Sequence, residues 1–127
     1  MTRLKSNGKI IGMLAMLSIM VIGLFSVCAQ AASKYGKYVV LTGSVAGNLA
    51  TTTVENYTSV SRYMTLSLKD ESNNVIVSKA AKVGGYYSMT ISNVGVTNYA
   101  VVQAHCTVYN SIAPASGTAE SFGIYIK

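Results

Sequence analysis

The chain has 127 residues, with one proline, no tryptophan and a formal net charge of +6. Three of its ten basic residues lie in the first nine positions, so residues 32–127 have seven basic and four acidic side chains and a net charge of +3. These cations are scattered along the sequence, which excludes the clustered basic face of a nucleic-acid-binding protein. The length indicates one domain.

Residues 1–31 have the pattern of a secretory signal peptide. A basic start precedes an uncharged apolar run over residues 10–27, which is expected to be helical. Ala29 and Ala31 then supply the small side chains of an A-x-A cleavage site. We expect cleavage after Ala31 and a secreted, extracellular product.

Two alternatives to cleavage exist. The apolar run over residues 10–27 has about the length that a membrane-spanning helix needs, so the protein could instead be anchored by it. Cys28 could carry a lipid, but Val27 and Phe25 occupy the positions where a lipobox has a small residue and a leucine. The basic start and the long apolar run are typical of exported proteins of Gram-positive bacteria.

Residues 32–127 are rich in Val, Thr, Tyr and Ser, which favour strands, and no segment sustains helical spacing. Residues 32–36 are expected to be a flexible tail. Residues 50–57 are polar and are expected to form an edge strand, and the Asp/Asn-rich turn at residues 70–74 predicts a hairpin over residues 61–81. The predicted strands cover residues 37–46, 50–57, 61–69, 75–81, 86–92, 98–110 and 118–127.

This spacing of about seven strands predicts an all-β domain, a single small antiparallel β-sandwich of the Ig-like or Greek-key kind. The domain has one cysteine and therefore no internal disulfide, so the fold must rest on its core. Period-two alternation predicts which side chains point inward. These are Val39, Leu41, Val45, Met64, Leu66, Leu68, Tyr87, Met89, Ile91, Ala100, Val102, Ala104, Cys106, Val108, Phe122, Ile124 and Ile126.

No motif for catalysis, a metal or a cofactor stands out, and we expect that the protein is not an enzyme. His105 and Cys106 are adjacent on one strand, so they point to opposite faces and do not form a dyad. The turn at residues 70–74 has the first ligands of a calcium loop, but it lacks the Gly and Glu at later positions. Asn56-Tyr57-Thr58 matches a glycosylation acceptor, although no glycan is expected in a bacterium.

The tyrosines are the most informative feature, because all nine lie beyond residue 31, against a single phenylalanine there. Exposed tyrosines suit sugars, peptides and protein interfaces. We therefore expect a non-enzymatic protein that binds a surface glycan or a protein through a tyrosine-rich sheet face. The alternatives are a bacteriocin-like toxin and a structural subunit that assembles through sheet edges. The candidate binding residues, which alternate with the apolar side, are Tyr38, Tyr63, Tyr86, Tyr99, Tyr109 and Tyr125.

Overall fold

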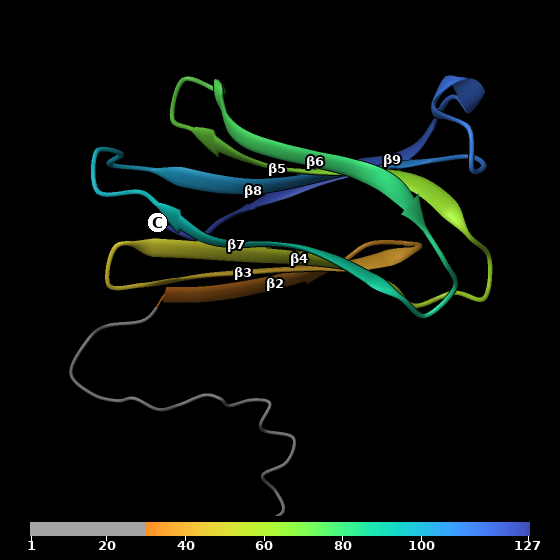
Figure 1. Cartoon of the computed structure of the whole chain (residues 1–127), viewed down its shortest axis with the longest axis horizontal. Coiled ribbons are helices and arrows are strands. Elements are labelled where there is room, and N and C mark those ends of the chain that lie inside the picture. Colours follow the sequence, from red (N-terminus) through yellow and green to blue (C-terminus); the bar gives the residue numbers. More distant parts are fainter. Residues whose placement is uncertain (1–29) are drawn as a thin grey trace, which may run out of the picture.

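The computed structural model describes residues 30–127, which form two antiparallel four-stranded sheets packed face to face (Figure 1). The predicted signal helix and the cleavage-site residue Ala29 lie outside the described residues. Within residues 30–127, no helix is long and apolar enough to cross a membrane. The prediction of an all-β sandwich is confirmed, and the described part of the chain has eight strands where about seven were expected.

Each sheet combines strands from distant parts of the sequence. The first sheet has the order β2-β3-β4-β7 and the second the order β6-β5-β8-β9. The first sheet consists of β2 (Gln30–Tyr35), β3 (Val39–Ala46), β4 (Leu49–Asn56) and β7 (Ser88–Gly95). The second consists of β5 (Arg62–Asp70), β6 (Val75–Val83), β8 (Val102–Tyr109) and β9 (Thr118–Tyr125), with a 3-10 turn, η1 (Pro114–Ser116), before β9.

The chain crosses between the sheets three times. It leaves the first sheet after β4, forms the β5–β6 hairpin in the second, and returns as β7 beside β4. It then crosses again to form β8 beside β5 and ends with β9. As a result, the edge strands β6 and β7 face each other along one side of the sandwich, and β2 faces β9 along the other (Figure 1).

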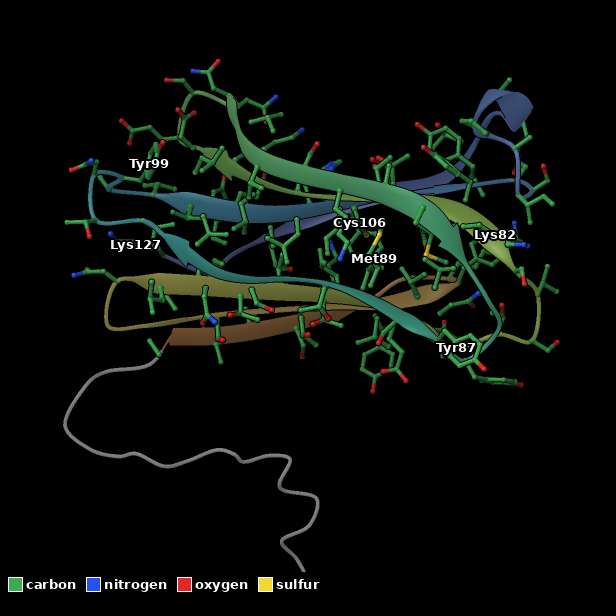
Figure 2. The ribbon with its side chains drawn as sticks, viewed as in Figure 1. Lys82, Tyr87, Met89, Tyr99, Cys106 and Lys127 are labelled. Atoms are coloured by element: carbon green, nitrogen blue, oxygen red, sulfur yellow. The ribbon has the colours of Figure 1, made fainter. Side chains whose placement is uncertain are left out.

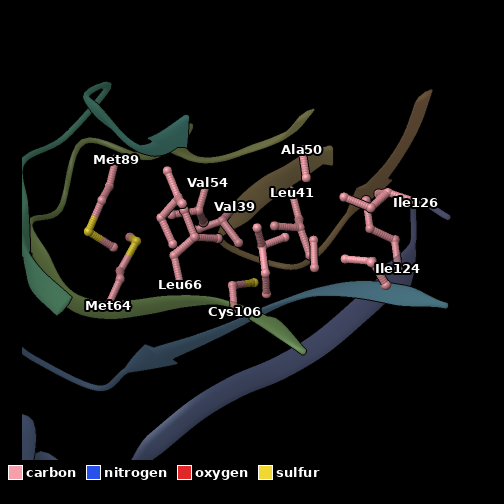
Figure 3. Packing of buried hydrophobic residues seen from close by; sticks show 14 of the residues in the cluster. Val39, Leu41, Ala50, Val54, Met64, Leu66, Met89, Cys106, Ile124 and Ile126 are labelled. Carbon is pink, nitrogen blue, oxygen red and sulfur yellow. The ribbon is translucent and has the colours of Figure 1, made fainter. Parts of the chain in front are cut away.

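The core follows the predicted alternation. Met64, Leu66 and Leu68 of β5 are fully buried, and they pack against residues of the opposite sheet. Figure 3 shows Met64 and Met89, which belong to different sheets, both pointing into the core. Each such buried side chain contributes about 1.5–3 kcal/mol of hydrophobic stabilisation, which allows the domain to fold without a disulfide.

Two of the predicted inward residues are wrong. Tyr87 is 72% exposed, because Tyr87 N donates to Gly84 O in a tight turn (3.0 Å) and β7 begins only at Ser88. Ala100 is exposed as well, since it precedes β8. In both places the predicted strand begins before the observed one and includes turn residues, whose side chains do not alternate between the two faces of a sheet.

The expectations for the start of the domain and for the polar strand are also wrong. Residues 32–36 are not a tail: most of them form β2, whose Tyr35 lies opposite Val40 of β3. The polar strand β4 is interior, between β3 and β7. Its buried Thr52 donates its hydroxyl to Thr42 O (2.7 Å), so a polar residue is accommodated inside the sandwich.

Candidate functional site

His105 and Cys106 lie on opposite faces of β8, as predicted. Cys106 is fully buried, and burial raises the pKa of its thiol to about 12, with a further contribution from the negative charge of Glu120. His105 lies on the outer face, where Ser121 Oγ is 3.4 Å from its Nε2. Burial and the charge of Lys69 lower the pKa of His105. The two side chains therefore cannot act as a nucleophile and base pair.

The turn after β5 uses its carboxylate to shape the backbone. Asp70 Oδ1 accepts hydrogen bonds from Ser72 N and Asn74 N, each at 2.9 Å. These bonds define the turn that the sequence predicts for residues 70–74. Across residues 30–127, no group of three or more His, Cys, Asp and Glu side chains could hold a metal ion.

Most tyrosines gather where β2, β4, β6 and β8 end, which we call the tyrosine end. Backbone hydrogen bonds join the loops at this end: Tyr57 N donates to Tyr38 O, and Tyr86 N donates to Thr58 O. Of the six candidate residues, four lie at this end, whereas Tyr99 and Tyr125 lie at the opposite end. Figure 2 shows this separation, with Tyr87 and Tyr99 at opposite ends. The tyrosine end comprises Tyr35, Tyr38, Tyr57, Tyr63, Tyr86, Tyr87 and Tyr109.

A buried asparagine holds two loops of the tyrosine end. Asn56 is fully buried, and its Nδ2 donates to the carbonyls of Val60 (2.8 Å), Val83 (3.3 Å) and Gly84 (3.3 Å). Its Oδ1 accepts from the amide and the hydroxyl of Thr58. Every polar atom of the side chain is therefore satisfied. Because the Asn56 side chain is inaccessible, it cannot be glycosylated in the folded protein.

Some of the rings at this end are structural. The Arg62 guanidinium lies 4.2 Å from the ring centroid of the half-buried Tyr38, which joins the two sheets. Arg62 also donates to the carbonyls of Tyr109 (3.3 Å) and Asn110 (3.1 Å). Tyr63 and Tyr109 form an edge-to-face pair with centroids 5.5 Å apart. These half-buried rings therefore stabilise the tyrosine end, and only part of their surface is accessible to a partner.

The turn between β6 and β7 presents two rings to solvent. Tyr86 has a φ of +65° and is 69% exposed, next to the equally exposed Tyr87. A bulky residue is rare at positive φ, where glycine or asparagine avoids the steric cost. Gly85 is fixed by close packing, because an added Cβ would lie 2.5 Å from Ser59 O. A strained and exposed tyrosine at such a position is an observation that points to function.

A groove opens beside this turn, between the edge strands β6 and β7. It has a volume of about 440 Å³. Lys79, Lys82, Tyr87 and Met89 are among its lining residues. Lys79 lies opposite the buried Leu66 and its Nζ donates to Thr90 O (3.1 Å), whereas Lys82 lies opposite Tyr63 on the outer face of the sheet. No carboxylate lines it. Tyr87 thus belongs both to the exposed turn and to the groove.

Sequence reasoning found part of this surface. It selected Tyr86, but it missed Tyr35 and Tyr87, because it assigned Tyr35 to a tail and Tyr87 to the core. The Gly84-Gly85 pair is the signal that could have placed both following tyrosines in a turn. The groove itself has no local sequence signal, since β6 and β7 meet there only after the chain crosses between sheets.

No known protein-family model matches this chain, and the search of curated proteins finds no match.

Proposed function

We propose that the protein is a secreted, non-enzymatic binding module that contacts a surface glycan or a protein through the tyrosine end. The observation that carries this proposal is Tyr86, a large aromatic residue held at positive φ in an exposed turn. Glycine or asparagine would be more stable there, so a side chain kept at a steric cost needs another reason to be present. Recognition of a partner by the ring supplies that reason.

The preformed scaffold supports a binding role. Asn56 and Arg62 fix the loops beneath the exposed rings, so little conformational freedom is lost when a partner binds. Tyrosine loses few rotamers on binding and combines a flat apolar ring with a hydroxyl, which suits both sugars and polypeptides. The crossing of consecutive strands between the sheets is consistent with a Greek-key sandwich as the scaffold.

Export is the second element of the proposal. Ala31 belongs to β2 and is paired with Ser44 of β3. Cleavage after Ala31 must therefore occur before β2 pairs with β3, while the segment is still accessible. After cleavage, Ala32–Tyr35 remain to pair with β3. Expression in a Gram-positive host tests this step: we expect the protein in the medium with Ala32 as its first residue. An intact chain retained in the membrane fraction contradicts it.

Binding is tested with matched tyrosine variants. The purified protein is incubated with cell-envelope preparations, and the bound fraction is measured for wild type, Tyr86→Asn, Tyr87→Asn and the control Tyr125→Asn. Tyr125 is 68% exposed but lies at the opposite end. We expect each variant at the turn to bind about 10-fold more weakly and the control to bind as the wild type does. Equal binding by all four proteins would overturn the proposal.

A further inference from the structure

We propose that the tyrosine end also docks on a lipid bilayer with anionic headgroups, with Val60 and Ile112 entering the interface and Lys37 and Lys82 contacting the headgroups. This inference goes beyond the proposed function, because it concerns the aliphatic and basic side chains of this end and not the recognition of a partner by Tyr86. A glycan or protein that Tyr86 recognises would then lie at the membrane surface.

Exposed apolar and aromatic side chains concentrate at the tyrosine end. Within residues 30–127, nine large side chains of this kind are exposed, and six of them lie where β2, β4, β6 and β8 end. A contiguous apolar patch on a soluble domain marks a contact with a protein or a membrane. The six are Tyr35, Tyr57, Val60, Tyr86, Tyr87 and Ile112, and the three at the opposite end are Leu49, Val75 and Tyr125.

The loops that carry these six side chains contact one another. Tyr86 N donates to Thr58 O (3.1 Å), which joins the β6–β7 turn to the loop between β4 and β5. Tyr63 N donates to Ser111 O (2.8 Å), which joins the loop between β8 and β9 to the start of β5. All three connections lie at the same end of the sandwich (Figure 1). The exposed side chains therefore belong to one group of adjoining loops.

The tyrosine end also carries an excess of positive charge. It has four basic and two acidic side chains, whereas the opposite end of the described domain has two of each. Lys37 and Lys82 are exposed, and Figure 2 shows Lys82 at the same end as Tyr87. Basic side chains beside an apolar patch favour an anionic lipid surface. The charged residues at the tyrosine end are Lys34, Lys37, Glu55, Arg62, Lys82 and Glu120, and those at the opposite end are Lys69, Asp70, Glu71 and Lys127.

A lipid surface accounts for side chains that a glycan does not use. Tyrosine is enriched at membrane–water interfaces, where its ring is in the apolar layer and its hydroxyl is hydrated. Val60 and Ile112 are 51% and 55% exposed, but they offer a sugar neither a flat ring nor a hydrogen-bonding group. Neither residue lines the groove between β6 and β7. A bilayer can accept such separate loop tips, because it needs no matching shape and its binding scales with buried apolar area and charge.

Co-sedimentation of residues 30–127 with lipid vesicles tests the proposal. This range contains both sheets and the core, and it leaves out the apolar run over residues 10–27, which would bind vesicles by itself. The vesicles consist of phosphatidylcholine alone or of phosphatidylcholine mixed with phosphatidylglycerol. We expect about fivefold or stronger preference for the anionic vesicles. Binding should weaken as NaCl rises from about 0.05 M to about 0.5 M, because salt screens the lysine contacts.

A first pair of variants tests the aliphatic side chains. Val60→Ser/Ile112→Ser and the control Leu49→Ser/Val75→Ser remove similarly exposed side chains from opposite ends of the domain. We expect about fivefold weaker vesicle binding for the first and less than about twofold change for the control. Circular dichroism verifies that each variant is folded.

A second pair tests the cations. Lys37→Gln/Lys82→Gln and the control Lys69→Gln/Lys127→Gln lower the net charge equally, but only the first acts at the tyrosine end. We expect about 10-fold weaker binding to anionic vesicles for the first and less than about threefold change for the control, because the attraction falls off within a Debye length of the surface.

The outcomes separate this inference from the proposed function. Absence of vesicle binding, equal binding to neutral and anionic vesicles, or an equal loss in a variant and its control overturns the inference. If Tyr86→Asn still weakens binding to cell envelopes, the proposed function stands without it. Vesicle binding that depends on Val60 and Ile112 supports the inference, and if Tyr86→Asn then leaves envelope binding unchanged, the proposed function alone fails.

Discussion

The two sides of the sandwich, each formed by a pair of facing edge strands, differ in the contacts that join those strands. On the side of β2 and β9, Glu120 of β9 accepts hydrogen bonds from Lys37 N (2.6 Å) and Tyr38 N (2.9 Å) in the turn after β2. Beside it, the Lys34 amine lies 5.5 Å from the ring centroid of Phe122. Between β6 and β7, the hydrogen bond from Lys79 to Thr90 O crosses an open groove.

This difference separates a structural side from a side available to a ligand. A carboxylate that accepts two backbone N–H bonds is a strong, charge-assisted lock between elements far apart in sequence. A single lysine that spans an open groove ties the edges weakly and leaves space beside it. We infer that the closed side maintains the sandwich and that the open side can bind a ligand without disturbing it.

The largest expected effect comes from breaking the closed side. Glu120→Ala leaves the amides of Lys37 and Tyr38 without their acceptor, and we expect the free energy of unfolding to fall by about 2–3 kcal/mol. Denaturation by urea, followed by circular dichroism, measures it. Glu55→Ala, at an exposed position of β4, is the control and should change stability by less than about 0.5 kcal/mol. A loss no larger for Glu120→Ala than for the control contradicts the comparison.

The thiol near the closed side gives the next effect. The pKa of Cys106 is raised from 9.0 to about 12 in the folded protein, so above pH 9 only the unfolded chain releases this proton. Stability from this group is complete below pH 9 and falls by about 1.4 kcal/mol per pH unit above it. The difference in unfolding free energy between wild type and Cys106→Ala, compared at about pH 8 and about pH 10, isolates this contribution. A difference that does not change with pH contradicts the buried, protonated thiol.

A smaller effect of opposite sign is expected at the exposed turn beside the open side. Tyr86→Asn places a residue that tolerates positive φ in the turn, and we expect stability to rise by about 1 kcal/mol. Thermal unfolding of this variant and of Tyr125→Asn measures the gain. An equal change in both variants shows that the backbone strain at Tyr86 is not its cause.

The smallest effect on stability is expected from the lysine that spans the groove. Lys79→Ala removes one exposed hydrogen bond, and we expect less than about 0.5 kcal/mol of lost stability. The change uncovers the Thr90 carbonyl, so the β7 edge becomes able to pair with another strand. Sedimentation velocity should show more self-association for Lys79→Ala than for Lys82→Ala. A variant that stays as dispersed as the control contradicts the protective role of Lys79.

The sequence predicts the strands well and the edges poorly. The hairpin over residues 61–81 and the buried positions of β5 follow from local alternation and one Asp/Asn turn. The interior position of β4 does not, because its polar residues satisfy their hydrogen bonds only with neighbouring strands, as Thr52 does with Thr42 O. Only part of the candidate site could be predicted. Tyr86 lies outside the apolar alternation and was therefore selected, whereas the exposure of Tyr87 and the presence of the groove depend on where the turn ends.

The sequence by itself determined the all-β class and most of the core, because successive side chains of a strand point to opposite faces and this alternation is visible locally. Only the tertiary structure decided which strands are edges, which side is closed by Glu120, and that segments distant in sequence bring seven tyrosines to one end. Those features depend on pairing between residues far apart in the chain, such as β4 with β7. No local pattern encodes such a pairing.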